Sequence, residues 1–397
     1  MMRLSLNGVN GSVKWFTERS RAKCDRSGVA HGNQFWYDFR RTFRLDEGAN
    51  RIACKQVKRM ENEFDFNAPI SRREAIRKAV IFSSGAWAAS RFGALQAAPP
   101  QTDFSKDGLH LLALGDYGTK GDAAQTSVAK AMASFAGTLG SPLTAVLALG
   151  DNFYRTMTPD RFEKHFEQMY SKESLDCPFY ACAGNHDYGT AKYDFQEGKL
   201  QMQLDYAKHN PDSRWKFPAK WYAVELPDAE NPLVKVIVLD GSYWEGALTP
   251  QEKIEQRRFL KAELKKKTKA PWVWMMNHYP LFSECAAHGN SPALIREWGP
   301  MLKENPISLC FAGHDHTLQH LKVDGYDASF IVSGGGGARL YDVHLTKLGF
   351  VNGRDLGFNH IHVTPEHVEV QFINAAGEQL HAFRRTVKGE VKVLSAA

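Results

Sequence analysis

From residue 108 onward, short apolar runs alternate along the chain with longer stretches of helical periodicity. The short runs are apolar at nearly every position, which predicts strands covered on both faces rather than strands with one face in water. They span residues 110–114, 145–149, 179–183, 234–239, 273–276 and 309–312. Helices are predicted over residues 122–135, 159–170 and 249–267, and residues 357–384 return to strand-like alternation. This pattern predicts an α/β or α+β domain with buried sheets.

The third predicted helix carries its own start signal. It opens with Thr249-Pro250-Gln251-Glu252, in which threonine and the glutamate three residues later form a capping box. Proline suits the first helical position because its missing N–H would have no partner there.

The segment before this domain has the order of an export signal. Ser71-Arg72-Arg73 opens a basic stretch, an apolar and small-residue run follows over residues 79–90, and small residues precede Pro99. This order is typical of a secretory signal, and the paired arginines resemble the twin-arginine type. The apolar run holds about a dozen residues against the ~20 that a spanning helix needs, so we expect no stable membrane span. We predict that residues 60–102 direct export to the periplasm or the exterior; an amphipathic surface helix is the alternative.

Charge separates the N-terminus from the rest of the chain. Residues 1–59 hold 13 Lys/Arg against 5 Asp/Glu and show neither helix nor strand periodicity, whereas the chain from residue 103 holds 32 against 35. The formal net charge of +6 therefore comes from the N-terminus, which argues against a nucleic-acid partner. Met60 stands where a signal would ordinarily start, so residues 1–59 are predicted to be an over-extended start or a dispensable extension. Residues 103–390 are predicted to form a single domain, expected to be a monomer.

Five of the predicted strands end in polar clusters. In open α/β sheets ligands bind beyond the carboxyl ends of the strands, so these clusters can meet at one place. Together they offer carboxylate, amide, imidazole and phenol groups, which suit Fe(III) and also Zn(II), Mn(II) or Fe(II). A single Gly-Asp at a strand end is usually a turn, but five clusters in sequence indicate a metal site. They are Gly115-Asp116-Tyr117-Gly118, Gly150-Asp151-Asn152-Phe153-Tyr154, Gly184-Asn185-His186-Asp187, Asn277-His278-Tyr279-Pro280 and Gly313-His314-Asp315-His316.

The order of these clusters resembles the five-block signature of the purple acid phosphatases, a branch of the calcineurin-like metallophosphoesterases. Further segments, among them Arg161-Phe162, Arg214-Trp215 and His278-Tyr279-Pro280, are similar to the small, animal-type (tartrate-resistant) members. The resemblance extends from about residue 108 to about residue 340. It implies a four-layer αββα sandwich in which two sheets are flanked by helices.

The resemblance also implies a dinuclear centre that pairs Fe(III) with a divalent ion of Fe, Zn or Mn. The tyrosine of the second block distinguishes the purple branch, because charge transfer from tyrosinate to iron gives that branch its colour. In this chain the ferric ligands would be Asp116, Tyr154 and His316, the divalent ligands Asn185, His278 and His314, and the bridging ligand Asp151.

We therefore predict an acid phosphatase that hydrolyses small phosphate monoesters by direct attack of a metal-bound hydroxide. His186, next to Asn185, is predicted to contact the phosphate or to protonate the leaving group. His288 matches a second substrate histidine of the family. The family commonly has an acidic residue just before it where this chain has Ala287, so His186 is the preferred proton donor. Asn152 is predicted to contact the substrate as well.

Two other functions fit the same residues. A phosphodiesterase or nucleotide pyrophosphatase can use the same dinuclear core, and relative rates on aryl phosphate mono- and diesters would separate it from a monoesterase. A non-hydrolytic metal-binding or redox protein is the second alternative, although the presence of all seven ligands argues against a loss of catalysis.

Overall fold

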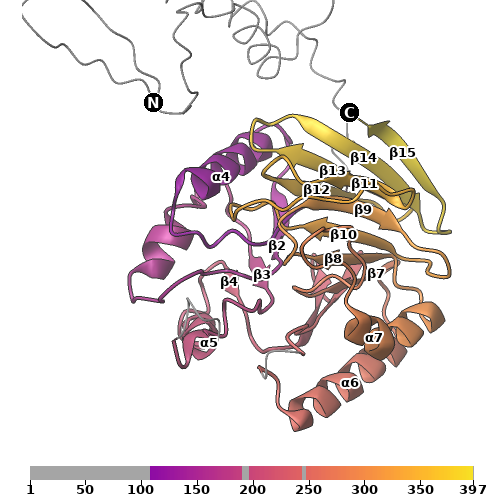
Figure 1. Ribbon diagram of the computed structural model, residues 1–397, viewed down its shortest axis with the longest axis horizontal. Helices are drawn as coiled ribbons and strands as arrows, with labels where there is room; N and C mark the ends of the chain where they lie inside the picture. The colour runs from indigo at the N-terminus through magenta and orange to yellow at the C-terminus, as the bar shows by residue number, and fades with distance from the viewer. Residues whose placement is uncertain (1–107, 190–195, 244–246, 397) are drawn as a thin grey trace, which may run out of the picture. The chain divides into compact units, whose positions relative to one another are not determined.

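The computed structural model describes residues 108–189, 196–243 and 247–396 (Figure 1). The predicted extension over residues 1–59 and the signal-like segment over residues 60–102 lie outside these ranges. All described residues fall within one unit of the chain, which begins at Ala97. Within the described ranges, no helix combines the length and the apolar composition needed to cross a bilayer.

Parallel and antiparallel strands combine in an eight-stranded sheet of order β15-β14-β13-β12-β1-β2-β3-β4. The half from β1 to β4 is parallel. On its other side β1 pairs antiparallel with β12, and successive antiparallel pairs continue to β15. The strands are β1 (Leu109–Leu114), β2 (Leu143–Ala148), β3 (Phe179–Ala181), β4 (Trp215–Lys216), β12 (Gly357–Val363), β13 (His367–Asn374), β14 (Gln379–Thr386) and β15 (Val391–Ala396).

A second sheet has seven strands in the order β11-β9-β10-β8-β7-β6-β5. Its centre is parallel from β6 through β7 and β8 to β10, and the outer strands β5, β9 and β11 pair antiparallel. The strands are β5 (Tyr222–Leu226), β6 (Val234–Val238), β7 (Trp272–Met276), β8 (Leu309–Ala312), β9 (Leu318–Lys322), β10 (Ser329–Ser333) and β11 (Gly349–Asn352).

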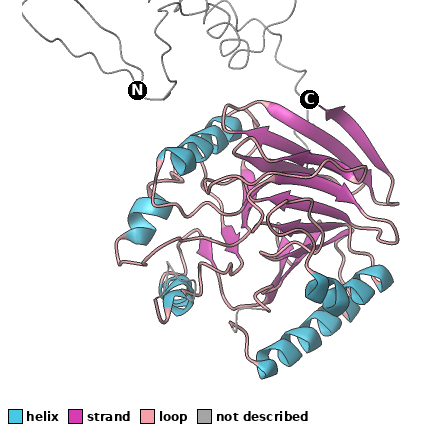
Figure 2. Ribbon diagram, viewed as in Figure 1, coloured by secondary structure: helices cyan, strands magenta, loops and turns pink. Residues whose placement is uncertain are grey.

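Helices cover the outer faces of the two sheets (Figures 1 and 2). Helix α4 (Ala123–Ala136) lies on one side, and α6 (Pro250–Lys265) and α7 (Pro292–Glu304) lie on the other, while α5 (Lys199–His209) lies near β4. Leu294 and Trp298 of α7 and Leu260 of α6 are fully buried and pack with Met275 of β7 in one hydrophobic cluster. This arrangement is the four-layer αββα sandwich of the metallophosphoesterases that the resemblance implies.

All six apolar runs form strands, at β1, β2, β3, β6, β7 and β8. The start of α6 also follows its sequence signal. The Glu252 N–H donates to Thr249 Oγ1 at 3.2 Å, and the Thr249 N–H donates to Glu252 Oε2 at 2.8 Å. The helix predicted over residues 159–170 forms only in part, because Glu163–Glu167 adopt a π-helical turn. In that turn Phe166 is buried and packs on Phe179 and Trp215, with ring centroids 5.0 and 5.1 Å apart.

Candidate metal centre

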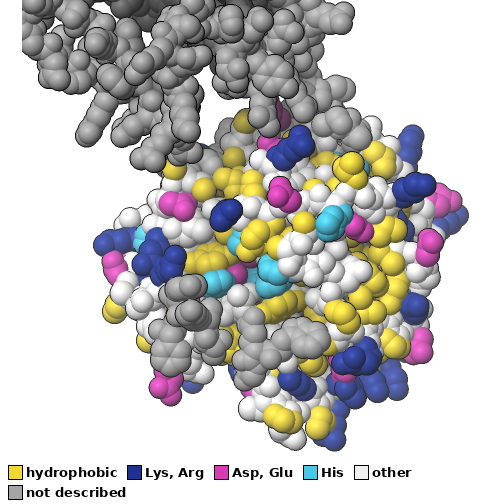
Figure 3. Space-filling view, viewed as in Figure 1, with side chains coloured by type: hydrophobic (Ala, Val, Ile, Leu, Met, Phe, Trp, Pro, Cys, Tyr) yellow, Lys and Arg dark blue, Asp and Glu magenta, His cyan; other side chains and the backbone are white. Residues whose placement is uncertain are grey.

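The predicted ligands follow strands of both sheets. The strands that precede them are parallel within each sheet, so their carboxyl ends point to one edge of the sandwich. Figure 3 shows histidine side chains gathered near the middle of the face in view. In chain order the residues are Asp116 after β1, Asp151 and Tyr154 after β2, Asn185 after β3, His278 after β7, and His314 and His316 after β8.

Asp116, Tyr154 and His316 form one group of donor atoms. Tyr154 Oη lies 3.4 Å from Asp116 Oδ1 and 3.2 Å from His316 Nε2, and His316 Nε2 lies 3.4 Å from Asp116 Oδ1. Bonds of about 2.0–2.2 Å to a common metal place neighbouring ligand atoms about 3 to 3.5 Å apart. The three atoms therefore have the spacing of ligands to one ion.

Asn185, His278 and His314 form the second group. Asn185 Oδ1 lies 3.1 Å from His278 Nε2 and 3.1 Å from His314 Nδ1. Asp151 Oδ1 lies 3.5 Å from His278 Nε2, and one donor atom each of Asp151, His278 and Asp116 of the first group lie within 4.8 Å of one another. The structure thus brings all seven residues together as two groups of three with Asp151 between them.

The backbone at three of these residues is strained. Asp116, Asp151 and His314 have φ values of 59°, 51° and 64°, in the left-handed region that residues with a Cβ rarely adopt. Such a conformation costs on the order of 1–3 kcal/mol and persists where the surrounding structure enforces it, most often at functional sites. Close packing adds to this constraint, since a Cβ at Gly313 would lie 2.7 Å from Asp116 Oδ2.

Backbone carbonyls orient two of the imidazoles. His278 Nδ1 lies 2.8 Å from the Leu149 carbonyl oxygen, and His316 Nδ1 lies 2.6 Å from the Arg339 carbonyl oxygen. A carbonyl oxygen only accepts, so each Nδ1 must carry the proton that it donates. In the neutral imidazole, Nε2 then presents its lone pair to the ligand group, which is how metal-binding histidines are usually fixed.

The donor set fits metal cations. Asp116 and Asp151 are buried carboxylates, and among the described residues their charged partners within 4.0 Å are histidines alone. Asp116 Oδ2 is buried and has no hydrogen-bond partner among the described residues. A buried carboxylate oxygen without a partner is costly unless a cation neutralises it. Carboxylate, amide, phenol and imidazole donors are those expected for iron, zinc or manganese.

The proton affinities of the site also depend on a cation. Burial and the carboxylates of Asp151 and Asp116 hold the pKa of Tyr154 well above its usual range. Burial alone would lower the pKa of His278, but the same two carboxylates outweigh it and raise that pKa to about 10. In the metal-free protein both groups therefore keep their protons at neutral pH. Metal binding must release these protons, so acid favours metal loss.

Asp187 joins two of the ligand-bearing loops. Its Oδ2 accepts from the N–H of Gly184 at 2.9 Å, and from both the N–H and the side-chain amide of Asn152 at 3.1 Å. Its Oδ1 accepts from the Phe153 N–H at 3.1 Å and from the Gln203 amide at 3.0 Å. Burial and the Asp151 carboxylate raise the pKa of Asp187, whereas these five donors favour its ionised form. Asp187 thus fixes the loop after β2 against the loop after β3.

Asn152 lies within this network rather than in the ligand group. The residue as a whole is 1% exposed. Its Oδ1 accepts from Tyr117 Oη at 2.8 Å, and its Nδ2 donates to the Cys182 carbonyl at 3.0 Å as well as to Asp187. This placement does not support the predicted contact with substrate, because the polar atoms of the side chain are used inside the core.

His186 lies beside the first group. Its backbone N–H donates to Asp151 Oδ1 at 2.9 Å, and its carbonyl accepts from the fully buried Lys199 Nζ at 2.7 Å. Its half-buried ring contacts that of Tyr154 with centroids 4.4 Å apart. The backbone is therefore fixed on both sides of a side chain that water can reach.

His288 lies beside the second group. Its ring stacks on that of His314 with centroids 4.5 Å apart, and its Nδ1 lies 2.7 Å from Asp315 Oδ1. The hydrogen bonds to Asp315 and Cys285 raise the pKa of His288 to about 10. This imidazole therefore carries a positive charge at acid and neutral pH and can face an anion.

Four residues that sequence reasoning did not assign support this site. Asp187 and Asp315 stand inside the polar clusters, so their position next to proposed ligands in the sequence could have indicated a supporting role. Lys199 and Tyr341 carry no such signal, because only folding brings them near. The Tyr341 ring stacks on that of His316 with centroids 4.4 Å apart and an interplanar angle of 10°.

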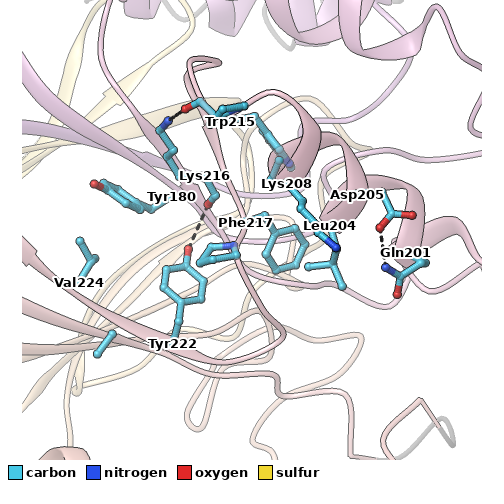
Figure 4. Close-up of a pocket in the computed structure, with 14 residues that line it drawn as sticks. Tyr180, Gln201, Leu204, Asp205, Lys208, Trp215, Lys216, Phe217, Tyr222 and Val224 are labelled. Carbon is cyan, nitrogen blue, oxygen red and sulfur yellow. Dashed lines mark hydrogen bonds between the residues drawn. The ribbon is translucent and has the colours of Figure 1, made fainter.

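A hollow of about 570 Å³ lies elsewhere, between α5, β4 and β5 (Figure 4). Gln201 Nε2 donates there to Asp205 Oδ1 at 2.8 Å, and Tyr222 Oη donates to the Lys216 carbonyl at 3.3 Å. None of the predicted ligands lines this hollow. These polar groups hydrogen-bond with one another. We therefore assign the chemistry of the protein to the two ligand groups and not to this hollow.

Comparison with known proteins identifies the family. Residues 109–318 match the calcineurin-like phosphoesterase family. Tartrate-resistant acid phosphatase type 5 of Sus scrofa is 30% identical over 303 residues, covering 68% of this chain and 85% of that protein. Purple acid phosphatase 7 of Arabidopsis thaliana is 30% identical over 299 residues, covering 70% of this chain and 86% of that protein. The solved structure of GAP50, the anchor in the inner membrane complex of Plasmodium, shares the fold with a TM-score of 0.57 at 20% identity, covering 69% of this chain and 87% of that one. The seven converging donors and these relatives agree: the chain belongs to the calcineurin-like phosphoesterases and, within them, to the purple acid phosphatases.

Proposed function

We propose that this acid phosphatase hydrolyses small phosphate monoesters at a dinuclear centre whose ligands are the two groups described above. The observation that carries the proposal is the convergence of seven oxygen and nitrogen donors around the buried Asp116 Oδ2, which finds no hydrogen-bond partner in the part of the chain that the structure describes. The relatives named tartrate-resistant and purple acid phosphatases support the monoester as substrate.

The two ligand groups are suited to different metal ions. Asp116 and Tyr154 give the first group two anionic oxygen ligands once the phenol is deprotonated, which favours Fe(III). The second group offers two imidazoles and a neutral amide, which favours a divalent ion of Fe, Zn or Mn. When bound, two such cations would bind phosphate oxygens, lower the pKa of water and stabilise the entering and leaving oxygens of an in-line displacement.

His186 is the proposed proton donor to the leaving oxygen. Its backbone is held by Asp151 and Lys199, while its half-buried ring lies against Tyr154 at the edge of the first group. A proton delivered from this position neutralises the alkoxide that departs, a contribution that is typically about 10²- to 10⁴-fold in rate.

His288 is the proposed phosphate contact beside the second group. Asp315 keeps this imidazole protonated, with a pKa of about 10. A group with that pKa holds its proton too tightly to be the better acid, but its charge can bind a phosphate oxygen throughout the acid and neutral range. The positive charge of His288 thus suits it to binding phosphate, and the role of proton donor is left to His186.

Rates on two aryl substrates test the proposal. We expect the metal-replete full chain to hydrolyse 4-nitrophenyl phosphate faster than bis(4-nitrophenyl) phosphate. Asp116→Asn should lose both activity and bound metal, whereas Asp228→Asn, at an exposed aspartate remote in sequence from the ligand clusters, should keep both. Faster hydrolysis of the diester would favour the phosphodiesterase alternative, and a metal-replete protein inactive on both esters would favour a non-hydrolytic role.

Export and chain organisation are part of the same proposal. The signal-like residues 60–102 would direct the protein out of the cytoplasm by the twin-arginine route, residues 1–59 would be dispensable, and residues 103–390 would act as a monomer. N-terminal sequencing of the mature protein and light scattering on the purified chain test these points. A mature chain that starts before Met60 would contradict the proposal that residues 1–59 are dispensable.

A further inference from the structure

Metal-binding side chains also gather on the hairpin formed by β12 and β13. The sequence His360-Ile361-His362-Val363-Thr364 leads into the turn, and His367-Val368-Glu369 leads out of it. Glu369 pairs directly with His362 across the hairpin. Alternate residues of a strand share a face, so His367, two residues before Glu369, lies on that face as well. One donor atom from each of these three residues lies within 4.8 Å of the other two.

This cluster is remote from the dinuclear centre. His362 pairs with His110 at the start of β1, whereas Asp116 follows the end of that strand. Six residues at about 3.3 Å each put roughly 20 Å between the two positions. His360, which shares the face with His362, contacts Phe135 of α4 with ring centroids 4.9 Å apart. The cluster therefore lies on the helix-covered outer face of the first sheet.

The spacing of the donor atoms suits a small divalent cation. Glu369 Oε2 lies 3.8 Å from His362 Nδ1, and Glu369 Oε1 lies 3.9 Å from His367 Nε2. Zinc bonds of about 2.0–2.2 Å need such atoms about 3.4 Å apart. Binding one ion therefore requires a movement of the side chains that brings both imidazoles to the same carboxylate oxygen, Oε2, because Arg384 pairs with Oε1. The His367 side chain, which is 28% exposed, has the freedom to make it.

Neighbouring groups already orient the three side chains. Thr364 Oγ1 lies 3.3 Å from His367 Nδ1 and accepts from the His367 N–H at 3.1 Å, which leaves Nε2 directed at Glu369. Arg384 is paired with Glu369 Oε1, so Oε2 remains directed at His362.

We propose that His362, His367 and Glu369 bind one Zn²⁺ ion that is separate from the dinuclear centre. Two imidazoles and one carboxylate are nitrogen and oxygen donors of the kind that bind zinc, and water can complete the tetrahedron from the side of His367. The ion would join the two strands next to their turn and would hold the outer half of the first sheet. Its role is structural, since the reacting groups lie at the other end of β1.

Zinc binding by the metal-replete full chain tests this site. Equilibrium dialysis against Zn²⁺, followed by elemental analysis, should find one more zinc per chain than the dinuclear centre accounts for. His367→Gln changes a part-exposed side chain, so the fold should persist while the affinity for this equivalent falls at least ten-fold. Glu369→Gln should have the same effect. His209→Gln, at an exposed histidine that ends α5, is the matched control and should keep the equivalent.

Phosphatase activity separates this result from the proposed function. Hydrolysis of 4-nitrophenyl phosphate should be unchanged in His367→Gln, because the dinuclear centre stays intact. The proposal is overturned if the parent protein binds no additional zinc, or if His367→Gln binds it with unchanged affinity. An inactive parent that still binds the additional zinc would count against the proposed function alone.

Discussion

Replacing Asp187 with asparagine should destabilise the site without changing its shape. The two side chains have nearly the same volume, so packing is retained and only the hydrogen bonds change. Asp187 accepts three bonds on Oδ2 and two on Oδ1. The asparagine amide must place its NH₂ at one of these two positions. Placing it at the Oδ1 position loses two accepted bonds rather than three.

The expected loss follows from the donors at that position. The Gln203 amide can turn over and accept from the new NH₂ only by giving up the bond that its oxygen accepts from Asn152 Nδ2 at 3.3 Å, and the backbone N–H of Phe153 can only donate. A hydrogen bond to a charged group is worth about 1.5–3 kcal/mol, and a buried donor without an acceptor costs about 1–3 kcal/mol. The free energy of unfolding should therefore fall by about 3 kcal/mol. The phosphatase rate should fall as well, because the same two loops carry Asp151 and Asn185.

Urea unfolding of the parent and the variant measures this difference. Asp228→Asn is the matched control: one oxygen of Asp228 accepts from the Glu230 and Asn231 N–H groups at 2.8 and 2.9 Å, and the asparagine oxygen can keep both bonds. The control should unfold with the parent. An Asp187→Asn protein within about 1 kcal/mol of the parent, with full activity, would refute the assigned role of the carboxylate, since even one lost charged bond is worth more.

Three further predictions follow from the ligand groups and the buried histidines. Tyr154→Phe should abolish visible absorption while iron stays bound; a colourless, iron-free and active parent protein would instead place the chain among metallophosphoesterases without a tyrosinate. His186→Gln should slow alkyl phosphates far more than 4-nitrophenyl phosphate, whose leaving group needs little protonation, and an equal loss on both would exclude its role as proton donor. Burial lowers the pKa of His381 to about 4, below the value of about 6.5 for an unfolded histidine. The resulting stability is present above pH 6.5 and falls by about 3 kcal/mol as the pH drops toward 4. His381→Phe should flatten that part of the unfolding profile, and an unchanged slope would contradict this reasoning.

The sequence pattern was sufficient for the parallel strands and for the polar clusters that the fold brings together, but not for the residues that hold those clusters in place. A continuous apolar run such as that of β2 marks a strand buried on both faces, and a polar residue directly after it marks the edge where ligands gather. The two-residue strand β4 has too few positions to show a period. The role of Asp187 depends on donors from α5 and from the loop after β2, which are distant in sequence. Asn152 stands beside a ligand in the sequence, yet its side chain turns into the core, and only coordinates show that direction.

The proposed ligands follow strands of both sheets, and this affects how long the folded protein would last. Asp116, Asp151 and Asn185 follow strands of the first sheet, and His278 and His314 follow strands of the second. A pair of bound ions would therefore cross-link the two halves of the sandwich, much as a disulfide would. Separation of the sheets would then have to wait for an ion to leave. The dissociation rate of the metals, rather than the equilibrium stability of the chain, would set how long the enzyme survives a chelator or a protease.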